Sequence, residues 1–313
     1  MSLGIKAIAS YIPVGSIDNV EQGVKFAEDE NFIRSKIGAL KLPIKNQEQE
    51  TSDLAVAAVN ALIAQYPDFD VSCLDALVVV TQNGDGEGLP HTSAIVQQKA
   101  GLPTTVAAFD VSLGCSGYVY GLYVLKGFLQ ATGLRNGLLI TADPYSKVVD
   151  RSDRVTSLLF GDAATATWIG ENPRWALGES GFGTDGGGAE HLHVENGTLN
   201  MNGRQVFNFA AMKVAPHIQQ ILQKAKLGAE DIDAFCVHQG SAAIVDAISR
   251  RFGAQSNRFV LDIEETGNTI SSSIPLLLEK HAFSSDWKRV VVSGFGVGLS
   301  WATALLERDD YAK

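Results

Sequence analysis

The sequence has few cysteines, no block of basic residues and no long apolar run. Its three cysteines, Cys73, Cys115 and Cys236, form no Cys-x-x-Cys pair and no even set, so neither a zinc knuckle nor a disulfide-rich secreted scaffold is indicated. No apolar run reaches about 18 residues, and no basic leader precedes an apolar stretch at the N-terminus. We therefore expect no membrane span and a cytoplasmic location.

Positive charge is also scarce. The chain carries 25 Lys and Arg against 35 Asp and Glu, a net charge of -10. Proteins that bind nucleic acids or membrane surfaces usually neutralise phosphates with a basic patch, so both classes are disfavoured. Only 19% of the 313 residues are charged, which is low for a soluble domain and indicates a large core or a subunit contact.

Apolar strand-like segments occur in two similar pairs. LDALVVVTQ (74–82) is echoed by IDAFCVHQ (232–239), and NGLLITAD (136–143) is echoed by KRVVVSGFG (288–296). Short, wholly apolar runs of this kind are typical of strands buried on both faces, and helical patterns lie between them. The sequence therefore predicts a layered α/β protein built from two duplicated halves, which we place at residues 1–170 and 171–313.

The segment DVSLGCSGYVYGLYVLKGFLQ (110–130) contains the most distinctive predicted helix. From Ser116 to Thr132 it has only Lys126 and Gln130 as long polar side chains, which indicates a helix enclosed between layers. By contrast, the Gly-rich stretch from Glu179 to Asn202 has the composition of a surface excursion.

Cys115 lies where this buried helix begins. The helix N-terminus favours an anion, so we expect it to lower the thiol pKa and to make the sulfur nucleophilic. Flanking Gly114 and Gly117 leave space for a substrate. A buried cysteine also serves as a small hydrophobic residue, and the pattern alone leaves both interpretations open. Cys73 and Cys236, at a turn and within a strand, are predicted to be structural.

Among the six histidines, only His238 ends a buried strand, at the edge where α/β sheets usually bind ligands. His191 and His193 have no third metal ligand at a recognisable spacing, so no metal site is expected. Gly267 and Asn268 form a predicted tight turn before a Ser-rich helix start, which could equally be a helix cap.

Four further blocks of sequence are distinctive: GCSGYVYGL around Cys115, VHQGSAAIVDAI from Val237, ETGNTISSSIP around Asn268 and SGFGVGLSWATALL near the C-terminus. Together they resemble beta-ketoacyl-acyl-carrier-protein synthase III enzymes of the thiolase superfamily. RVTSLLFGDAATA and LNMNGRQVFNFA follow the family's order, so the resemblance covers nearly the whole chain. It implies a thiolase-like αβαβα layered fold, a homodimer and a role in fatty acid biosynthesis.

The resemblance also implies a reaction. Cys115 would accept an acyl group from acyl-CoA, while His238 and Asn268 would stabilise the enolate formed when a malonyl thioester loses carbon dioxide. Condensation would give a 3-oxoacyl product. Backbone N–H groups of Cys115 and Val297 would form an oxyanion hole, with Phe295 packed beside the trio. No cofactor is expected, because acyl-CoA is itself a substrate.

Further positions match the family's substrate contacts. Phe32 and Arg154 would stack on the adenine of coenzyme A, and Lys36 would contact the nucleotide. Leu89 occupies the place of an aromatic gate that the dimer partner contributes to the acyl pocket. Because leucine is smaller, a longer or branched acyl group is expected to fit.

One departure concerns the malonyl carrier. Family members that use acyl carrier protein usually read Ala-Asn-Leu-Arg-Ile after the His-Gln pair, whereas this chain reads GSAAI and has Ala243 in place of the basic residue. Acidic carrier proteins approach through complementary positive charge. The malonyl group is therefore expected as a thioester of acyl carrier protein, of CoA or of a different carrier.

The sequence is compatible with three alternative functions. The first is acyl transfer to an oxygen or nitrogen nucleophile without decarboxylation, in specialised metabolite or polysaccharide synthesis; Asn268 argues against it because simple transfer has less need of an enolate stabiliser. The second is an idle subunit that serves a partner synthase, which the complete trio disfavours. The third is a metal hydrolase, which the scattered histidines disfavour.

Overall fold

The computed structural model describes residues 3–86 and 88–308, whose main element is a nine-stranded sheet in the order β11-β12-β13-β8-β1-β7-β6-β4-β5. In chain order its strands are β1 (Leu3–Tyr11), β4 (Ala76–Val80), β5 (Ala107–Val111), β6 (Gly137–Ala142), β7 (Ala164–Glu171), β8 (Trp175–Thr184), β11 (Ala234–Val237), β12 (Arg289–Gly296) and β13 (Ser300–Arg308). Two small sheets pair β2 (Ser16–Asp18) with β3 (Lys41–Pro43) and β9 (Leu192–Glu195) with β10 (Thr198–Met201).

The sheet repeats one topology on either side of its middle. In the first half β4 and β6 run parallel, with Ala76 opposite Gly137, and β7 and then β1 follow antiparallel. In the second half β11 and β12 run parallel, with Ala234 opposite Val290, and β13 and then β8 follow antiparallel. The predicted strand duplication is therefore confirmed, while the proposed division at residues 170 and 171 stays a prediction.

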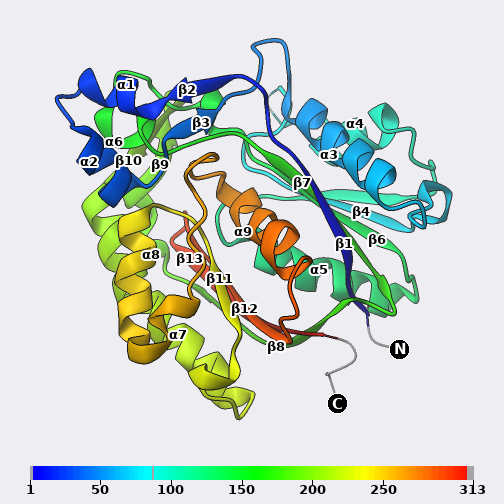
Figure 1. The fold of residues 1–313 in the computed structure, drawn as a ribbon. Helices are drawn as coiled ribbons and strands as arrows, with labels where there is room; N and C mark the ends of the chain where they lie inside the picture. The colour runs from blue at the N-terminus through cyan, green and yellow to red at the C-terminus, as the bar shows by residue number, and fades with distance from the viewer. Residues whose placement is uncertain (1–2, 87, 309–313) are drawn as a thin grey trace.

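Five layers result (Figure 1). Helices α5 (Gly117–Thr132) and α9 (Ser273–Leu277) lie in the middle, between the two halves of the sheet. The outer faces are covered by α3 (Thr51–Gln65) and α4 (Thr92–Lys99) on one side and by α7 (Gly203–Lys224) and α8 (Ala242–Ser249) on the other. The remaining α-helices are α1 (Asn19–Val24), α2 (Glu30–Phe32) and α6 (Arg154–Ser157). This is the predicted thiolase-like αβαβα arrangement.

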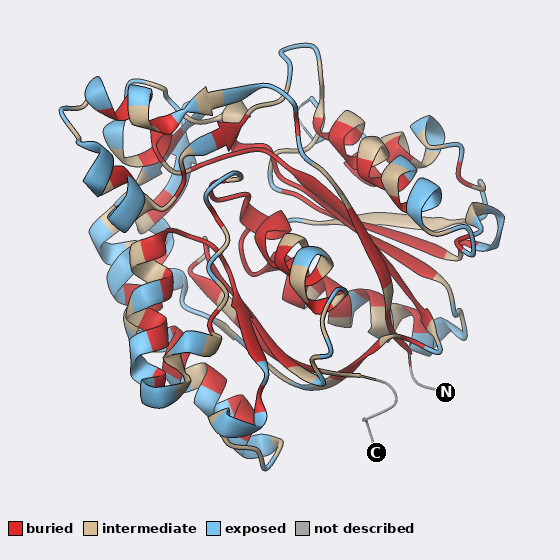
Figure 2. Cartoon of the chain, viewed as in Figure 1, coloured by how far each residue is buried: buried red, intermediate tan, exposed pale blue. Residues whose placement is uncertain are grey.

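The central helix α5 packs against both halves, as its composition predicts. Leu122, Leu125 and Leu129 are fully buried in one cluster with strands from each half. Gly117 permits the close approach, because a Cβ atom there would lie 2.4 Å from Cγ1 of Val80. Figure 2 shows the resulting continuous buried region through the strands and the two central helices.

The stretch from Glu179 to Asn202 differs from the prediction. Its first part belongs to β8, and β9 and β10 form a hairpin rather than a loose surface excursion. Leu192 and Leu199 are buried and pack in one cluster with Cys115. Among the described residues, no helix is both long and apolar enough to cross a membrane.

Candidate active site

A cavity of about 300 Å³ reaches from the surface to the centre of the molecule. Its inner wall contains Cys115, His238 and Asn268, which are 5%, 2% and 5% exposed. Its outer wall contains the partly exposed Phe32 and the exposed Arg154. The fold therefore brings the three predicted catalytic side chains together from both halves of the chain.

Cys115 lies in the turn that leads into α5 and faces the end of β12. The contact is close on the strand side: a Cβ atom on Gly296 would lie 2.7 Å from Sγ of Cys115, and one on Gly294 would lie 2.6 Å from the carbonyl oxygen of Cys115. Backbone N–H groups of Val297 and of Cys115 itself are directed to the sulfur. These are the two groups that the resemblance assigns to an oxyanion hole.

The thiol is not activated at rest, contrary to the expectation from the helix N-terminus. Burial, helped by the nearby Asp143 carboxyl group, raises the pKa of Cys115 to about 12, although the two backbone N–H groups act to lower it. The helix start consists of a turn with little solvent around the sulfur, so loss of hydration outweighs the dipole. A neutral thiol is the resting form near neutral pH.

His238 is neutral as well. Burial lowers its pKa to about 3, and Phe295 packs edge-on against the imidazole with ring centroids 5.4 Å apart. Nδ1 lies 2.7 Å from Oγ of Ser273, which fixes the ring orientation. A backbone hydrogen bond with Ile270 also acts on the imidazole and works against the lowering of its pKa.

Asn268 is oriented by a strained residue. Its Oδ1 accepts a hydrogen bond of 3.0 Å from the backbone N–H of Ile270, which has a φ of 54°. A left-handed conformation is costly for a β-branched residue and is typical of functional sites. Because Oδ1 is occupied, the Nδ2 donors of Asn268 remain available to a substrate oxygen.

The predicted substrate contacts are only partly gathered at the cavity. The guanidinium Cζ of Arg154 lies 5.3 Å from the Phe32 ring centroid, and Arg154 forms an ion pair with Glu28. Lys36 is exposed and does not line the cavity, although the adjacent Ile37 does. Leu89 is 92% exposed and lies outside the cavity of its own chain.

Other residues of the site were not found from the sequence. The cavity wall near Cys115 includes Tyr145, Phe160, Leu192 and Met201, which come from four separate segments. Their apolar character predicts nothing by itself, because the pattern equally fits a core. Within residues 3–86 and 88–308, no group of three or more His, Cys, Asp or Glu side chains could hold a metal ion.

The resting thiol makes alkylation strongly dependent on pH. In a Cys73→Ser background, we expect the rate of Cys115 modification by iodoacetamide to rise roughly tenfold per pH unit between pH 7 and 9, because only the thiolate reacts and its pKa lies well above this range. Intact-protein mass spectrometry measures the rate, with Cys115→Ala as the control. A rate that is flat between pH 6 and 8 would show a thiolate already present.

Comparison with known families agrees with this geometry. Residues 109–186 match the model of 3-oxoacyl-[acyl-carrier-protein (ACP)] synthase III, and residues 222–308 match the model of its C-terminal part. The first match contains Cys115, and the second contains His238 and Asn268.

Whole-chain similarity gives the same result. A beta-ketoacyl-[acyl-carrier-protein] synthase III from Lactococcus lactis is 33% identical, with 96% of this chain and 98% of that protein covered. The crystal structure of the Thermus thermophilus synthase III has a TM-score of 0.90 at 31% identity, covering 97% of this chain and 98% of that one. The priming beta-ketosynthase of the R1128 polyketide pathway has a TM-score of 0.87 at 28% identity, covering 98% and 97%. The chain belongs to the 3-oxoacyl-[acyl-carrier-protein] synthase III family and is an acyltransferase of the decarboxylative Claisen type.

Proposed function

We propose that Cys115, His238 and Asn268 condense an acyl-CoA with a malonyl thioester in two half-reactions. This proposal rests on one observation: the three side chains line the inner end of the same cavity, although they lie far apart in the chain. The products are coenzyme A, carbon dioxide and a 3-oxoacyl thioester, and one proton is consumed. We propose no cofactor besides the acyl-CoA substrate.

In acyl transfer, the neutral thiol of Cys115 must lose its proton as it attacks the thioester carbonyl. The pKa values of about 12 for Cys115 and about 3 for His238 disfavour a resting ion pair, so proton transfer to the imidazole accompanies attack. The N–H groups of Cys115 and Val297 would hold the oxyanion of the tetrahedral intermediate. The C–S bond to CoA then breaks, the CoA sulfur gains a proton, and Cys115 carries the acyl group.

In condensation, the malonyl carboxylate leaves as carbon dioxide and its bonding electrons form an enolate. Nδ2 of Asn268 and a protonated ring nitrogen of His238 would donate hydrogen bonds to the enolate oxygen. The enolate carbon attacks the acyl carbonyl, and the C–S bond to Cys115 breaks. The departing thiolate of Cys115 then takes up one proton.

The outer cavity suits a nucleotide. An adenine between Phe32 and Arg154 needs about 7 Å between the two planes, since each stacked contact takes about 3.5 Å. The guanidinium Cζ of Arg154 now lies 5.3 Å from the Phe32 ring centroid, so Arg154 must move outward to admit the adenine. Lys36 and Arg204 are exposed next to residues that line the cavity, and neither forms an ion pair with another described residue, so we propose both as phosphate contacts.

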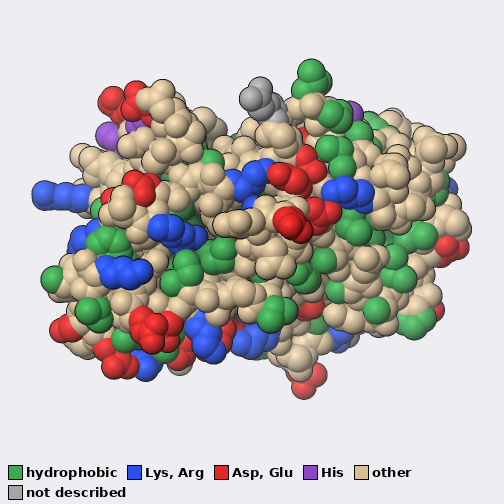
Figure 3. Space-filling model, turned by 90° about the horizontal axis from the view of Figure 1, so that it is seen from above, with side chains coloured by type: hydrophobic (Ala, Val, Ile, Leu, Met, Phe, Trp, Pro, Cys, Tyr) green, Lys and Arg blue, Asp and Glu red, His purple; other side chains and the backbone are tan. Residues whose placement is uncertain are grey.

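The malonyl carrier remains the least constrained substrate. Acyl carrier protein appears in the family's description, and a polyketide pathway appears in the description of one structural relative. The chain has Ala243 near the cavity, and acidic and basic side chains are interspersed on the face shown in Figure 3. We propose that malonyl thioesters of both acyl carrier protein and CoA are accepted.

A homodimer would cover an apolar surface that runs from β5 and α5 of the first half onto Phe182 of β8. The edge strand β5 pairs with β4 alone among the described strands, and its residues are only partly buried. Aromatic contacts continue from β5 along α5, through Phe109 with Phe128 and through Tyr120 with Phe182, which is 43% exposed. Pairing two β5 edges would satisfy their backbone groups. The role of the partner's Leu89 loop as a gate of the acyl pocket stays a prediction. The cytoplasmic location also stays a prediction.

Substitutions should separate the two half-reactions. Cys115→Ala should gain no acyl mass from any acyl-CoA, because the nucleophile is absent. Asn268→Ala should still form the acyl-enzyme but condense roughly 100-fold more slowly, as expected for loss of one oxyanion donor. Intact-protein mass spectrometry and release of labelled carbon dioxide from malonyl-CoA and malonyl-acyl-carrier-protein measure the two steps. Equal losses in both steps for Asn268→Ala would contradict the assignment.

Removing the proposed stacking of Arg154 on the adenine should weaken binding of acyl-CoA more than it slows the reaction steps. Arg154→Ala is expected to raise KM for acyl-CoA about tenfold with kcat nearly unchanged, because a desolvated stacked cation contributes on the order of 1 to 2 kcal/mol. Arg250→Ala is the matched control, since Arg250 is exposed and pairs with Asp246 of the preceding helix α8. An unchanged KM for Arg154→Ala would rule out the proposed stacking.

A charged side chain in the proposed dimer surface around Phe182 should disrupt the dimer. Phe182→Asp is expected to give monomers in light scattering after size exclusion at micromolar concentration, because the carboxylate would be buried without a partner. Met212→Asp, at another exposed apolar residue on α7, should leave the mass unchanged. A dimeric Phe182→Asp variant, or a monomeric parent protein, would refute this interface.

A further inference from the structure

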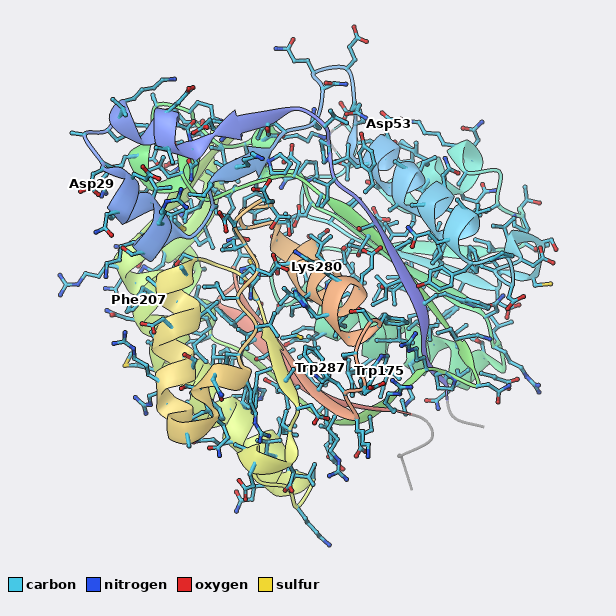
Figure 4. The ribbon with its side chains drawn as sticks, viewed as in Figure 1. Asp29, Asp53, Trp175, Phe207, Lys280 and Trp287 are labelled. Atoms are coloured by element: carbon cyan, nitrogen blue, oxygen red, sulfur yellow. The ribbon has the colours of Figure 1, made fainter. Side chains whose placement is uncertain are left out.

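A second cavity is lined by Gln239, which follows His238 in the chain, and by Ser273, which contacts the His238 ring. Its volume is about 190 Å³, compared with roughly 30 Å³ for one water in the liquid, so several waters fit. Ser10, Asp262, Glu265, Glu279 and Lys280 provide a polar and charged lining. Figure 4 labels Phe207, which lines the first cavity from α7, and Lys280, which lines the second from the segment that continues α9; the two project from different elements.

Ser273 joins this second cavity to the catalytic imidazole. Ser273 is one of the residues that line the cavity, and its Oγ lies 2.7 Å from Nδ1 of His238 and 3.0 Å from the carbonyl oxygen of Ile270. The first cavity contacts His238 from the side of Cys115 and does not include Ser273. The imidazole therefore lies between two cavities, with the serine hydroxyl on one side and the thiol on the other.

The hydroxyl can support either form of the ring. When it donates to the Ile270 carbonyl, it accepts from Nδ1–H, and the opposite nitrogen is free to accept the Cys115 proton. When it rotates and donates to Nδ1, the opposite nitrogen carries the proton and can donate to an enolate oxygen. The two half-reactions need these two forms in turn.

The proton balance requires a supply route. Condensation converts the acyl-cysteine to a thiolate that takes one proton, while a pantetheine chain in the first cavity would restrict water at its mouth. If the imidazole gives its proton to the Cys115 sulfur, it must recover one at Nδ1. Ser273 lines the second cavity and its hydroxyl contacts Nδ1, so it is placed to link water in that cavity with the imidazole.

We propose that Ser273 is a positioning residue for His238, whose hydroxyl passes a proton between Nδ1 and water in the second cavity. The same imidazole then accepts a proton in acyl transfer and donates one in condensation. This inference rests on the proposed function of the trio. The groups facing the route are Cys115 on the catalytic side and Asp262, Glu265, Glu279 and Lys280 around the second cavity.

The test compares Ser273→Ala with Ser273→Thr, which retains the hydroxyl, and with Ser271→Ala. Ser271 is a matched control because its buried Oγ has no hydrogen bond among the described residues. Cys115 is first loaded with acyl-CoA, and condensation with malonyl-CoA is then followed in a single turnover from pH 6 to 9. We expect Ser273→Ala to slow condensation roughly 10- to 100-fold and to change its pH profile, as for loss of proton transfer. The threonine and Ser271 variants should stay within about threefold of the parent.

A second variant keeps the proposal testable if Ser273→Ala does not fold. Leu276→Trp fills the second cavity from its lining while leaving the Ser273 hydroxyl in place, and it should also slow condensation and change the pH profile. Unchanged condensation in a folded Ser273→Ala, or in Leu276→Trp if Ser273→Ala is unfolded, would overturn the proposal. Failure of the parent protein to form an acyl-enzyme would instead refute the proposed function itself.

Discussion

The site depends on the close approach of two backbones, one from each half of the chain. The turn before α5 carries Cys115, and the end of β12 passes so near it that side chains at Gly294 and Gly296 would collide with the cysteine. This contact directs the Val297 N–H to the sulfur. Any change that separates the halves would therefore remove the proposed oxyanion donor at Val297 and the closed surroundings of Cys115.

Closure has an electrostatic consequence. Water that would solvate a thiolate or an imidazolium is excluded, so both Cys115 and His238 remain neutral at rest. A neutral pair avoids two buried charges and stays compatible with an apolar acyl chain. The same exclusion strengthens each hydrogen bond to an oxyanion once charge develops in the reaction. The site is thus built for charge that appears transiently rather than for a charged ground state.

Much of this arrangement could be predicted from residues alone. The paired strand segments predicted the duplicated topology, and the nearly unbroken apolar helix 116–132 predicted its central layer. The trio followed from its position at element ends together with the family resemblance. The Cys115 pKa could not be predicted, because sequence shows the helix start but not the solvent excluded from it. The hairpin β9–β10 was missed since its few inward-facing residues, Leu192 and Leu199, lie in a Gly-rich stretch typical of loops.

The strained backbone at Ile270 connects the features that sequence could not reveal. Its N–H orients Asn268 and its carbonyl accepts from Ser273, which in turn contacts His238. One residue with a positive φ therefore sets the relative orientation of Asn268 and His238, the two proposed enolate donors. A relaxed conformation would turn these two backbone groups to new directions and separate the donors. Because the segment is buried between the sheet halves, packing supplies the free energy that holds it in this costly conformation.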